Sequence, residues 1–383
     1  MHPPVIRLPG VEPHARVVVA MSGGVDSSVA AALCARSGYE VVGVTLQLYD
    51  HGAARGGRGT CCAGQDIYDA RRVADHLGIA HYVLDFEERF RREVIADFAD
   101  TYARGRTPVP CVRCNERIKF RDLLQVARDF GASALVTGHY ARRLEGTHGP
   151  ELHRARDAKK DQSWFLFPIT PAQLAFCHFP LGELTKAETR AIASALGLPV
   201  ADKAESQDIC FVPDGDHAQL LARLRPEALL AGDIVHLDGR RLARHAGIGR
   251  YTVGQRRGLA AATGERLYVL EIDAARHRIL VGPRAATYCR ELVTGPVNWL
   301  GPPGSVADLP VMVQHRYNQP AVPGRILRLD ATGARVMFET PESGVAPGQA
   351  CVFYAGDRLL GGGFIDSAPR LSLPAPETTA AVV

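Results

Sequence analysis

The stretch VVVAMSGGVDSS, residues 17–28, predicts a strand, a tight turn and the start of a helix. Val17 to Met21 form an apolar run long enough for a buried strand, and residues 26–35 have the apolar spacing of a docked helix. Gly23 and Gly24 occupy the joint between them. Such a joint leaves several backbone N–H groups unpaired at a helix N-terminus, which suits a phosphate.

Two common phosphate-binding fingerprints do not fit this stretch. A Walker loop needs a Lys before its Ser or Thr, and a dinucleotide loop needs GxGxxG, whereas only Gly23 and Gly24 are present here. A plain turn with a Ser or Asp cap therefore stays open as an alternative at this point.

Length and composition indicate a globular protein. The chain has 383 residues, 46% of them hydrophobic and 22% charged, which predicts two or three domains. No apolar stretch approaches the roughly 18 residues of a membrane span, and the first residues do not have the pattern of a secretory signal, so we expect no membrane contact and a cytoplasmic location. Nine cysteines favour free thiols over a disulfide scaffold. A net charge of +4 is too small to indicate a nucleic-acid partner by itself.

Strand and helix patterns alternate over the first part of the chain. We expect strands at 17–21, 40–48, 80–86 and 134–139, and helices at 26–36, 66–77, 88–103 and 115–130. This alternation is typical of an α/β domain with a parallel sheet, which binds ligands at the carboxyl edge of its strands. After about Pro213, short apolar runs between Gly, Pro and Asp turns predict a β-rich or barrel-like second half.

A C-x-x-C pair marks the stretch TPVPCVRCNERIKF, residues 107–120. We expect Asn115 to cap a helix, which puts Cys114 at a helix N-terminus between Arg113 and Arg117. Both features stabilise a thiolate and predict a lowered pKa for Cys114. A zinc site is the alternative, but no second C-x-x-C or H-x-x-x-H completes it.

Another cysteine, Cys210, lies in ESQDICFVP, residues 205–213. A buried core cysteine is the ordinary interpretation of such a residue. Polar and aromatic strings elsewhere, VTGHYA at 136–141, KDQSWFLF at 160–167 and GRYTVGQRRGL at 249–259, are of kinds that a core does not need.

Together these strings closely resemble the tRNA-specific 2-thiouridylases, PP-loop ATP pyrophosphatases that place sulfur on the wobble uridine of tRNAs for lysine, glutamate and glutamine. The resemblance runs from about residue 16 to 367. Its motifs occur in family order: SGGVDSS at 22–28, CC at 61–62, TPxPCxxCNxxIKF at 107–120, TGHYA at 137–141, KDQS at 160–163, SQDICF at 206–211, YTVGQRRGL at 251–259, RY at 316–317 and APGQ at 346–349.

The resemblance implies a fold and a domain order. We expect a flexible N-terminus at 1–15, an α/β PP-loop domain of the adenine nucleotide alpha hydrolase type at 16–215, and a small β-rich tRNA-binding domain at 216–283. A C-terminal β-barrel at 284–368 and a disordered tail at 369–383 complete the expected order.

The resemblance also implies an ATP site and an adenylation step. ATP converts the 2-oxygen of uridine into an adenylate, so that AMP can leave after sulfur has attacked. The implied ATP-binding residues are Ala20, Met21, Ser22, Gly23, Gly24, Val25, Asp26, Ser27, Leu46 and Gly138, with Asp26 also positioning Mg²⁺.

For sulfur transfer, the resemblance implies a persulfide on Cys210. Cys114 then acts as the nucleophile or as the thiol that releases sulfide, and a Cys114–Cys210 disulfide results. The target base leaves its stack and meets Val109, Pro110 and Cys111. Family members often have Asn at the position of Val109, and some have Asp at that of Cys111.

The implied partners are the anticodon stem-loop of tRNA and a sulfur donor such as a cysteine desulfurase or a sulfur-relay protein, and we expect a monomer. The residues implied to contact tRNA are His139, Lys160, Asp161, Gln162, Arg316, Tyr317 and Gln349.

Three alternatives remain at this point. Cys111, Cys114 and Cys210 could hold three corners of a [4Fe–4S] cluster whose fourth iron delivers sulfide. A PP-loop amide ligase of the argininosuccinate or GMP synthetase kind shares SGGxDS but does not need Cys114 and Cys210. A tRNA-binding protein without catalysis would not need an intact SGGVDSS together with both cysteines.

Overall fold

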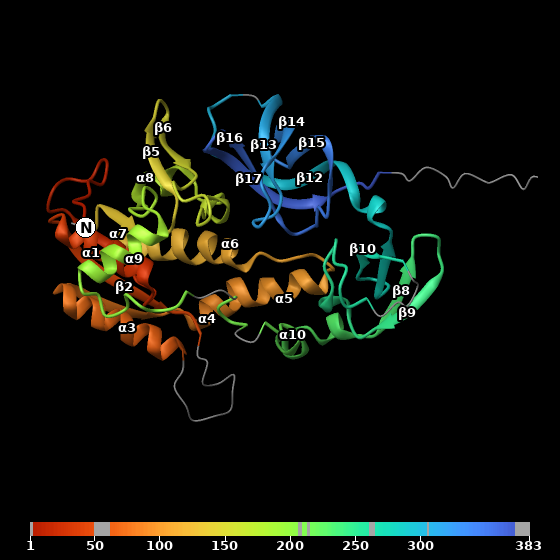
Figure 1. Cartoon of the computed structure of the whole chain (residues 1–383), viewed down its shortest axis with the longest axis horizontal. Helices are drawn as coiled ribbons and strands as arrows, with labels where there is room; N and C mark the ends of the chain where they lie inside the picture. Colours follow the sequence, from red (N-terminus) through yellow and green to blue (C-terminus); the bar gives the residue numbers. More distant parts are fainter. Residues whose placement is uncertain are drawn as a thin grey trace, which may run out of the picture.

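The computed structural model describes residues 3–49, 62–205, 209–212, 215–259, 265–304 and 306–371. Figure 1 shows a helix-covered sheet on the left, a barrel above the centre and a small sheet on the right, with α5 (Ala96–Ala103) lying below the barrel between the two sides.

The N-terminal domain is built on a parallel sheet, as predicted. Within the described residues its five strands have the order β3-β2-β1-β4-β7, and every neighbouring pair is parallel. The strands are β1 (Arg16–Ala20), β2 (Glu40–Gln47), β3 (Ala80–Asp85), β4 (Ala134–Val136) and β7 (Cys177–His178).

Apolar side chains of β1 pack on both faces of this sheet. Val17 and Val19 contact one core, which contains α1 (Val25–Arg36) and α9 (Lys186–Ala195), whereas Val18 contacts the core on the other face. All three valines are fully buried, and burial of each stabilises the fold by about 1.5–3 kcal/mol. Helix α3 (Cys62–Leu77) packs in the same core as α1, and α8 (Pro171–Phe176) packs in the core on the other face.

Strand order places a ligand site beside β1. The chain leaves β1 toward β2 and β3 on one side, while β4 and β7 lie on the other. Ligands of open α/β sheets bind at this reversal, outside the carboxyl ends of the strands. The turn after β1 and the turn after β4 therefore meet at one edge.

Two long helical segments follow β3 and precede β4. The first comprises α4 (Glu87–Phe90), π-helical η1 (Arg91–Ile95) and α5, and it matches the helix predicted at 88–103. The second comprises α6 (Pro110–Cys114), π-helical η2 (Asn115–Leu123) and α7 (Leu124–Asp129). In the second, the N–H of Leu124 donates to the carbonyl of Lys119, five residues earlier, which widens the helix locally.

A hairpin of β5 (Arg142–Gly146) and β6 (Gly149–His153) joins the N-terminal domain to the barrel, because His153 pairs with Arg358. The short helix η3 (Ser163–Leu166) follows this hairpin. The sequence pattern did not predict these elements.

The central domain carries a four-stranded sheet over the part of 216–283 that is described, with the order β10-β11-β8-β9. Its core contains Ile234, Val269, Ile279 and Val281. The elements are α10 (Ala218–Leu224), η4 (Pro226–Leu229), β8 (Gly232–His236), β9 (Arg241–His245), η5 (Ile248–Arg250), β10 (Tyr268–Asp273) and β11 (Arg278–Gly282).

The C-terminal domain is a barrel, which confirms the predicted fold class. Six of its described strands form an antiparallel sheet in the order β12-β15-β14-β13-β16-β17, and pairing of β12 with β17 closes this sheet into a barrel. The elements are η6 (Arg284–Thr287), β12 (Tyr288–Trp299), β13 (Ala307–Gln314), β14 (Val322–Asp330), β15 (Gly333–Ser343), β16 (Ala350–Ala355) and β17 (Arg358–Ser367). Val352 and Tyr354 share a core with Phe120 and Phe167 of the N-terminal domain, so the barrel is docked on it.

The two ends of the chain differ in what the structure describes. The flexibility predicted for residues 1–15 stays a prediction; among residues 3–15, Leu8 and Val11 are buried, and the N–H of Leu8 donates to the Tyr39 hydroxyl at 2.9 Å. Their burial against α1 supplies the packing that the composition did not reveal. Most of the predicted tail, residues 372–383, lies outside the described residues. No helix in the described part of the chain has the length and apolar character needed to cross a membrane.

Candidate active site

The SGGVDSS loop, residues 22–28, joins β1 to α1 at the carboxyl edge of the sheet. Gly24 is the N-cap of α1 and provides no side-chain cap, so the N–H groups of the first helical turn point out of the helix without partners in it. Gly23 has φ of +72°, and a Cβ there would lie 2.1 Å from the Asp66 carbonyl oxygen. Only glycine fits that position, and the loop presents backbone N–H groups as a phosphate site does.

Serines of the loop hold its shape. The Ser27 hydroxyl accepts from the Ser22 N–H at 3.1 Å and donates to the Gly24 carbonyl at 3.2 Å, and the Ser28 hydroxyl donates to the same carbonyl at 2.8 Å. Ser22 stays exposed while Ser27 and Ser28 are buried. The implied ATP-binding residues from Ala20 to Ser27 thus form one continuous turn.

Two other implied ATP-site residues lie beside this turn or at its sheet edge. A Cβ on Gly138 would lie 2.7 Å from the Ser27 nitrogen, so the segment after β4 touches the SGGVDSS loop through a glycine. Leu46 is half-buried near the end of β2 and packs against two of the cores.

Asp26 is held by side chains that the sequence did not indicate. Lys186, the first residue of α9, donates to its carboxylate oxygens at 2.7 and 2.8 Å, and the Tyr140 hydroxyl donates at 2.9 Å. Burial, followed by the neighbouring Asp26 charge, raises the pKa of Tyr140. A lysine ammonium therefore reaches the loop from a helix that lies far along the chain, and no local motif around Lys186 could have revealed it.

A second lysine, Lys203, also contacts the SGGVDSS loop. Lys203 donates to the Gly23 carbonyl at 3.1 Å and to Asp66 and Asp69 at 2.7 and 2.6 Å. Sequence reasoning missed this residue too, because its partners lie far from it along the chain.

The helix that carries the C-x-x-C pair begins earlier than predicted. Val109 is its N-cap and Pro110 its first residue, where a missing N–H and a fixed φ are favourable. Asn115 is therefore not a cap: it is buried in the helix, and its Nδ2 donates to the Phe165 carbonyl at 3.1 Å.

The predicted lowering of the Cys114 pKa is also wrong. Burial raises the pKa of the Cys114 thiol, which lies at the end of α6 rather than at a helix N-terminus. Arg113 and Arg117 form ion pairs with Asp97 at 3.5 and 3.2 Å. Their positive charges are therefore neutralised by a carboxylate and do not stabilise a Cys114 thiolate.

Cys210 is brought toward the C-x-x-C pair from a separate part of the chain. Burial, then the Cys114 and Cys111 thiols in turn, raise the pKa of Cys210 to about 12, so Cys210 lies within electrostatic reach of both. The adjacent Phe211 packs edge-on against Phe90 with ring centroids 5.7 Å apart, in the apolar cluster that contains Cys114. Cys111, Cys114 and Cys210 are all free thiols; Cys111 and Cys210 reach solvent and Cys114 is buried.

One cation, Lys119, faces all of these thiols. Its ammonium partly offsets the rise in thiol pKa that burial causes at Cys111, Cys114 and Cys210. Burial, followed by the same ammonium, holds the pKa of His139 well below its usual range, so that ring is neutral. Lys119 thus links the thiols to the segment beside the SGGVDSS loop. The quoted IKF string contained it, yet nothing in the string distinguished it from a surface lysine.

Residues implied to contact tRNA from the KDQS string have internal partners. Lys160 donates to Glu205 at 2.6 Å. Asp161 is buried and accepts from Arg154 at 2.9 Å and from the Ser163 hydroxyl at 2.9 Å. Gln162 accepts from the Tyr140 N–H at 2.9 Å and so fixes the turn after β4.

The implied tRNA-contact residues of the barrel lie at domain contacts. Arg316 donates to the Val253 carbonyl of the central domain at 2.8 Å. Tyr317 is exposed, and its ring centroid is 4.3 Å from that of Phe165. Gln349 approaches the Pro108 carbonyl at 3.5 Å. Their contacts with RNA stay predictions.

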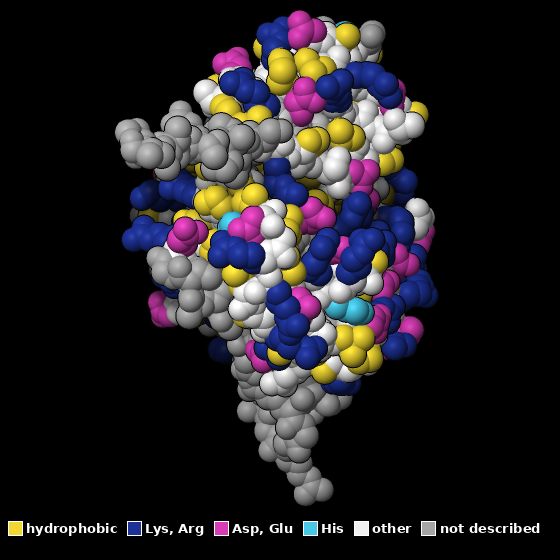
Figure 2. All heavy atoms as spheres, turned by 90° about the vertical axis from the view of Figure 1, so that its right-hand side faces the viewer, with side chains coloured by type: hydrophobic (Ala, Val, Ile, Leu, Met, Phe, Trp, Pro, Cys, Tyr) yellow, Lys and Arg dark blue, Asp and Glu magenta, His cyan; other side chains and the backbone are white. Residues whose placement is uncertain are grey.

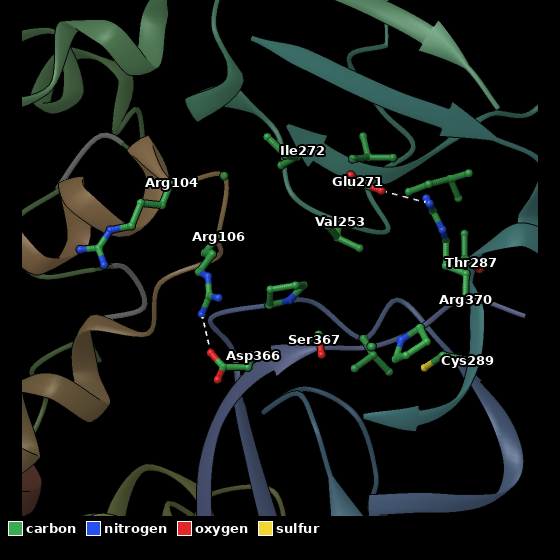
Figure 3. Close-up of a pocket in the computed structure, with 17 residues that line it drawn as sticks. Arg104, Arg106, Val253, Glu271, Ile272, Thr287, Cys289, Asp366, Ser367 and Arg370 are labelled. Atoms are coloured by element: carbon green, nitrogen blue, oxygen red, sulfur yellow. Dashed lines mark hydrogen bonds and ion pairs between the residues drawn. The ribbon is translucent and has the colours of Figure 1, made fainter. Parts of the chain in front are cut away.

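A cavity of about 420 Å³ lies where the three domains meet, away from the thiols. Figure 3 shows Arg106 paired with Asp366 and Arg370 paired with Glu271 across it, at 2.9 and 3.0 Å. These pairs join the end of α5, the barrel and the central sheet. The ion pairs that line this cavity therefore hold the three domains together.

Metal ligands are not grouped in the described ranges: no three His, Cys, Asp or Glu side chains come together closely enough to hold an ion. The cluster on Cys111, Cys114 and Cys210 therefore stays a prediction, as does the Mg²⁺ at Asp26. The second cysteine pair, Cys61 and Cys62, has side chains outside the described part of the chain.

Comparison with known proteins covers nearly the whole chain. The family model "tRNA methyl transferase HUP domain" matches residues 15–214, "tRNA methyl transferase PRC-barrel domain" matches 218–283, and "Aminomethyltransferase beta-barrel domain" matches 289–365. A tRNA-specific 2-thiouridylase MnmA from Rhodospirillum centenum is 58% identical over 379 residues, which cover 95% of this chain and 96% of that protein. The one from Parvibaculum lavamentivorans is 57% identical over 370 residues, covering 94% and 92%.

The fold and the site together define a HUP-domain protein with a glycine turn at the carboxyl edge of its sheet and free thiols at Cys111, Cys114 and Cys210. Within that class, the chain belongs to the tRNA-specific 2-thiouridylase MnmA family.

Proposed function

We propose that this protein is an ATP-dependent tRNA-uridine 2-sulfurtransferase. It adenylates the 2-oxygen of the wobble uridine in tRNAs for lysine, glutamate and glutamine, then replaces that oxygen with sulfur, giving 2-thiouridine, AMP and pyrophosphate. The observation that carries this proposal is the convergence of the SGGVDSS loop with Cys114 and Cys210, linked through Gly138, His139 and Lys119.

Adenylation uses the loop and its charged neighbours. The N–H groups at the start of α1 bind the ATP phosphates, and Gly138 lets the segment after β4 approach closely. The carboxylate of Asp26 is a suitable oxygen ligand for Mg²⁺, which would replace the Lys186 ammonium on it. Lys186 then faces the departing pyrophosphate, whose negative charge it stabilises.

Sulfur transfer uses the thiols in sequence. A sulfur donor, such as a cysteine desulfurase or a sulfur-relay protein, leaves a persulfide on the solvent-reaching Cys210. The terminal sulfur bonds to C2 of the adenylated uridine, and the C–O bond to AMP breaks. The Cys114 thiolate attacks the inner sulfur, so the two cysteines are oxidised to a disulfide while the transferred sulfur takes up the electron pair. A thiol reductant restores both cysteines. Val109, Pro110 and Cys111 lie at the start of this helix, beside the base.

The central domain supplies a basic face for tRNA. Residues 216–283 contain eleven Arg and no Lys against seven Asp or Glu, an excess equal to the +4 of the whole chain. Figure 2, which faces this side of the molecule, shows Lys and Arg side chains gathered over it. Arg244 and Arg276 are 64% and 74% exposed, as phosphate-contacting side chains must be. Tyr317, whose ring is tilted by 48° against that of Phe165, offers a partly exposed ring to an unstacked base.

Free thiols and a tRNA substrate both fit a protein that works in the cytoplasm as a monomer. The first test supplies purified protein with unmodified tRNA transcript, ATP and a persulfide donor, and measures 2-thiouridine by mass spectrometry of the nucleosides. ATP–pyrophosphate exchange that requires the tRNA is expected as well. Exchange that needs an amino acid or amide acceptor instead would identify an amide ligase, and tRNA binding without exchange would identify a non-catalytic binder.

The cluster alternative is tested on protein prepared without oxygen. We expect no iron or acid-labile sulfide, and we expect Cys111→Ala to keep thiolating with the persulfide donor, whereas Cys114→Ala and Cys210→Ala lose the activity. Iron bound by wild-type protein and lost in all three variants would overturn the persulfide scheme while leaving the overall reaction intact.

A further inference from the structure

Four charged side chains of alternating sign form a continuous row beside the SGGVDSS loop. Lys186 contacts Asp26 at 2.7 Å and Glu205 at 3.1 Å, and Lys160 contacts the other oxygen of Glu205 at 2.6 Å. The four residues come from four separate segments of the N-terminal domain. Arg190, also on α9, stands further away at 3.9 Å from Glu205.

The two ends of this row belong to different ligand sites. Asp26 lies in the SGGVDSS loop at the ATP phosphates, and Lys160 begins the KDQS string that the family resemblance assigns to tRNA. Lys186 is 12% exposed, so its ammonium stays among these groups, whereas Lys160 is 35% exposed and can reach a phosphate in solution. Glu205 is therefore the member of the row that joins the lysine of one site to the lysine of the other.

Lys160 and Lys186 share the negative charge of Glu205, because each contacts one of its carboxylate oxygens. Lys186 neutralises Asp26 while no nucleotide is bound, and ligands that take up Asp26 must displace that ammonium. Glu205 is the carboxylate beside it: one of its oxygens already lies 3.1 Å from Lys186, while Lys160 holds the other at 2.6 Å. The hydrogen bond from Lys160, and after it the one from Lys186, keep the pKa of Glu205 below its usual value, so the carboxylate is charged at neutral pH.

We propose that Glu205 is a positioning residue that couples tRNA binding to ATP binding. When a tRNA phosphate takes the Lys160 ammonium, Glu205 no longer shares its charge with Lys160 and holds Lys186 more tightly. Lys186 then leaves Asp26, which becomes available at the ATP phosphates. This inference rests on the proposed function, because it uses ATP and tRNA as the two ligands. Glu205 itself touches neither ligand and acts through the two lysines.

Coupling of this kind is reciprocal. If tRNA strengthens ATP binding by some factor, ATP must strengthen tRNA binding by the same factor, and such factors are typically about 5- to 150-fold. Because the row is partly exposed, salt screens it, and the factor shrinks as ionic strength rises.

Isothermal titration with the non-cleavable analogue α,β-methylene-ATP tests the proposal. The Kd of the analogue is measured with and without saturating unmodified tRNA transcript. We expect tRNA to lower the Kd at least about 5-fold in wild type and less than about 2-fold in Glu205→Gln, since a neutral amide cannot hold the released ammonium. Glu183→Gln is the matched control: Glu183 is an exposed carboxylate of the same domain, 3.9 Å from Arg142 and outside the row, and should keep the wild-type factor.

A merely structural role for Glu205 would change both affinities and leave their coupling factor unchanged. Full coupling in Glu205→Gln, absent coupling in wild type, or equal loss in the control overturns the proposal. If Glu205→Gln fails to fold, Glu205→Asp replaces it as the test, because this variant keeps the charge but is too short to contact both lysines. Undiminished coupling in Glu205→Asp would also overturn the proposal. A failed proposed function shows itself differently, as no 2-thiouridine in the nucleoside assay.

Discussion

Replacing Gly348 with alanine tests whether the barrel positions the segment that starts the cysteine helix. Gly348 has φ of +91°, and a Cβ there would lie 2.7 Å from the Thr107 carbonyl oxygen and 2.9 Å from its nitrogen. Both are backbone atoms, and the Thr107 N–H already donates to the Pro347 carbonyl at 2.8 Å. Thr107 precedes the Pro108–Pro110 stretch directly, so the contact reaches the start of α6.

The magnitude follows from two contributions. Left-handed backbone costs an alanine about 1–2 kcal/mol. Relief of the overlap moves Thr107 by about 0.7 Å, the gap between 2.7 Å and the 3.4 Å of ordinary contact. A displacement of about 1 Å can cost a hundredfold in rate. We therefore expect Gly348→Ala to lower the thiolation rate by about ten- to a hundredfold with ATP-analogue binding unchanged.

Gly356→Ala separates strain from displacement. Gly356 lies in the turn between β16 and β17, has φ of +57°, and a Cβ there would meet nothing within 4 Å. It carries the backbone strain without the overlap, so it should lose stability in a thermal melt and keep the wild-type thiolation rate. The reasoning fails if Gly348→Ala thiolates at the wild-type rate, or if both variants lose activity in proportion to their loss of stability.

Three further outcomes follow from the site. Asp26→Ala should abolish tRNA-dependent ATP–pyrophosphate exchange and leave the tRNA Kd within about twofold, because Asp26 lies at the phosphate loop; exchange at the wild-type rate would show that SGGVDSS is only a turn. Arg316→Ala should weaken tRNA binding and reduce the slope of log K against log salt by about one, through loss of a phosphate contact, and an unchanged salt series would confine Arg316 to its bond with the Val253 carbonyl. Alkylation of Cys210 by iodoacetamide, followed by mass spectrometry, should keep accelerating up to pH 10 and above, because the surroundings of this solvent-reaching thiol raise its pKa to about 12 and the reactive thiolate forms only as pH approaches that value; a plateau below pH 9 would contradict the raised pKa.

Local patterns were sufficient for the sheet and the loop. The run Val17–Met21, the glycines after it and the apolar spacing of α1 each depend on neighbours within a few residues, and the structure reproduces them as β1, the SGGVDSS loop and α1. The parallel sheet was predicted for the same reason, since alternation of strands and helices leaves few topologies. The family motifs added the ATP and thiol residues, which no periodicity could have assigned.

Electrostatic properties of the site could not be predicted in this way. The expected thiolate at Cys114 failed because pKa depends on burial and on which carboxylates take the nearby arginines, and Asp97 takes Arg113 and Arg117 only once α5 packs beside α6. The cap assigned to Asn115 failed because Pro110 begins the helix one turn earlier.

The sequence by itself determined the class of fold, the SGGVDSS loop and the two cysteines that we propose for the reaction, because each lies in a short contiguous motif. The tertiary structure alone decided that Lys186 neutralises Asp26, that Glu205 joins two lysines and that Gly348 rests on Thr107. Each of these contacts joins residues far apart along the chain. Their geometry depends on how helices and domains pack, and a charge or a van der Waals contact acts only over a few ångströms, so it exists only after the chain has folded.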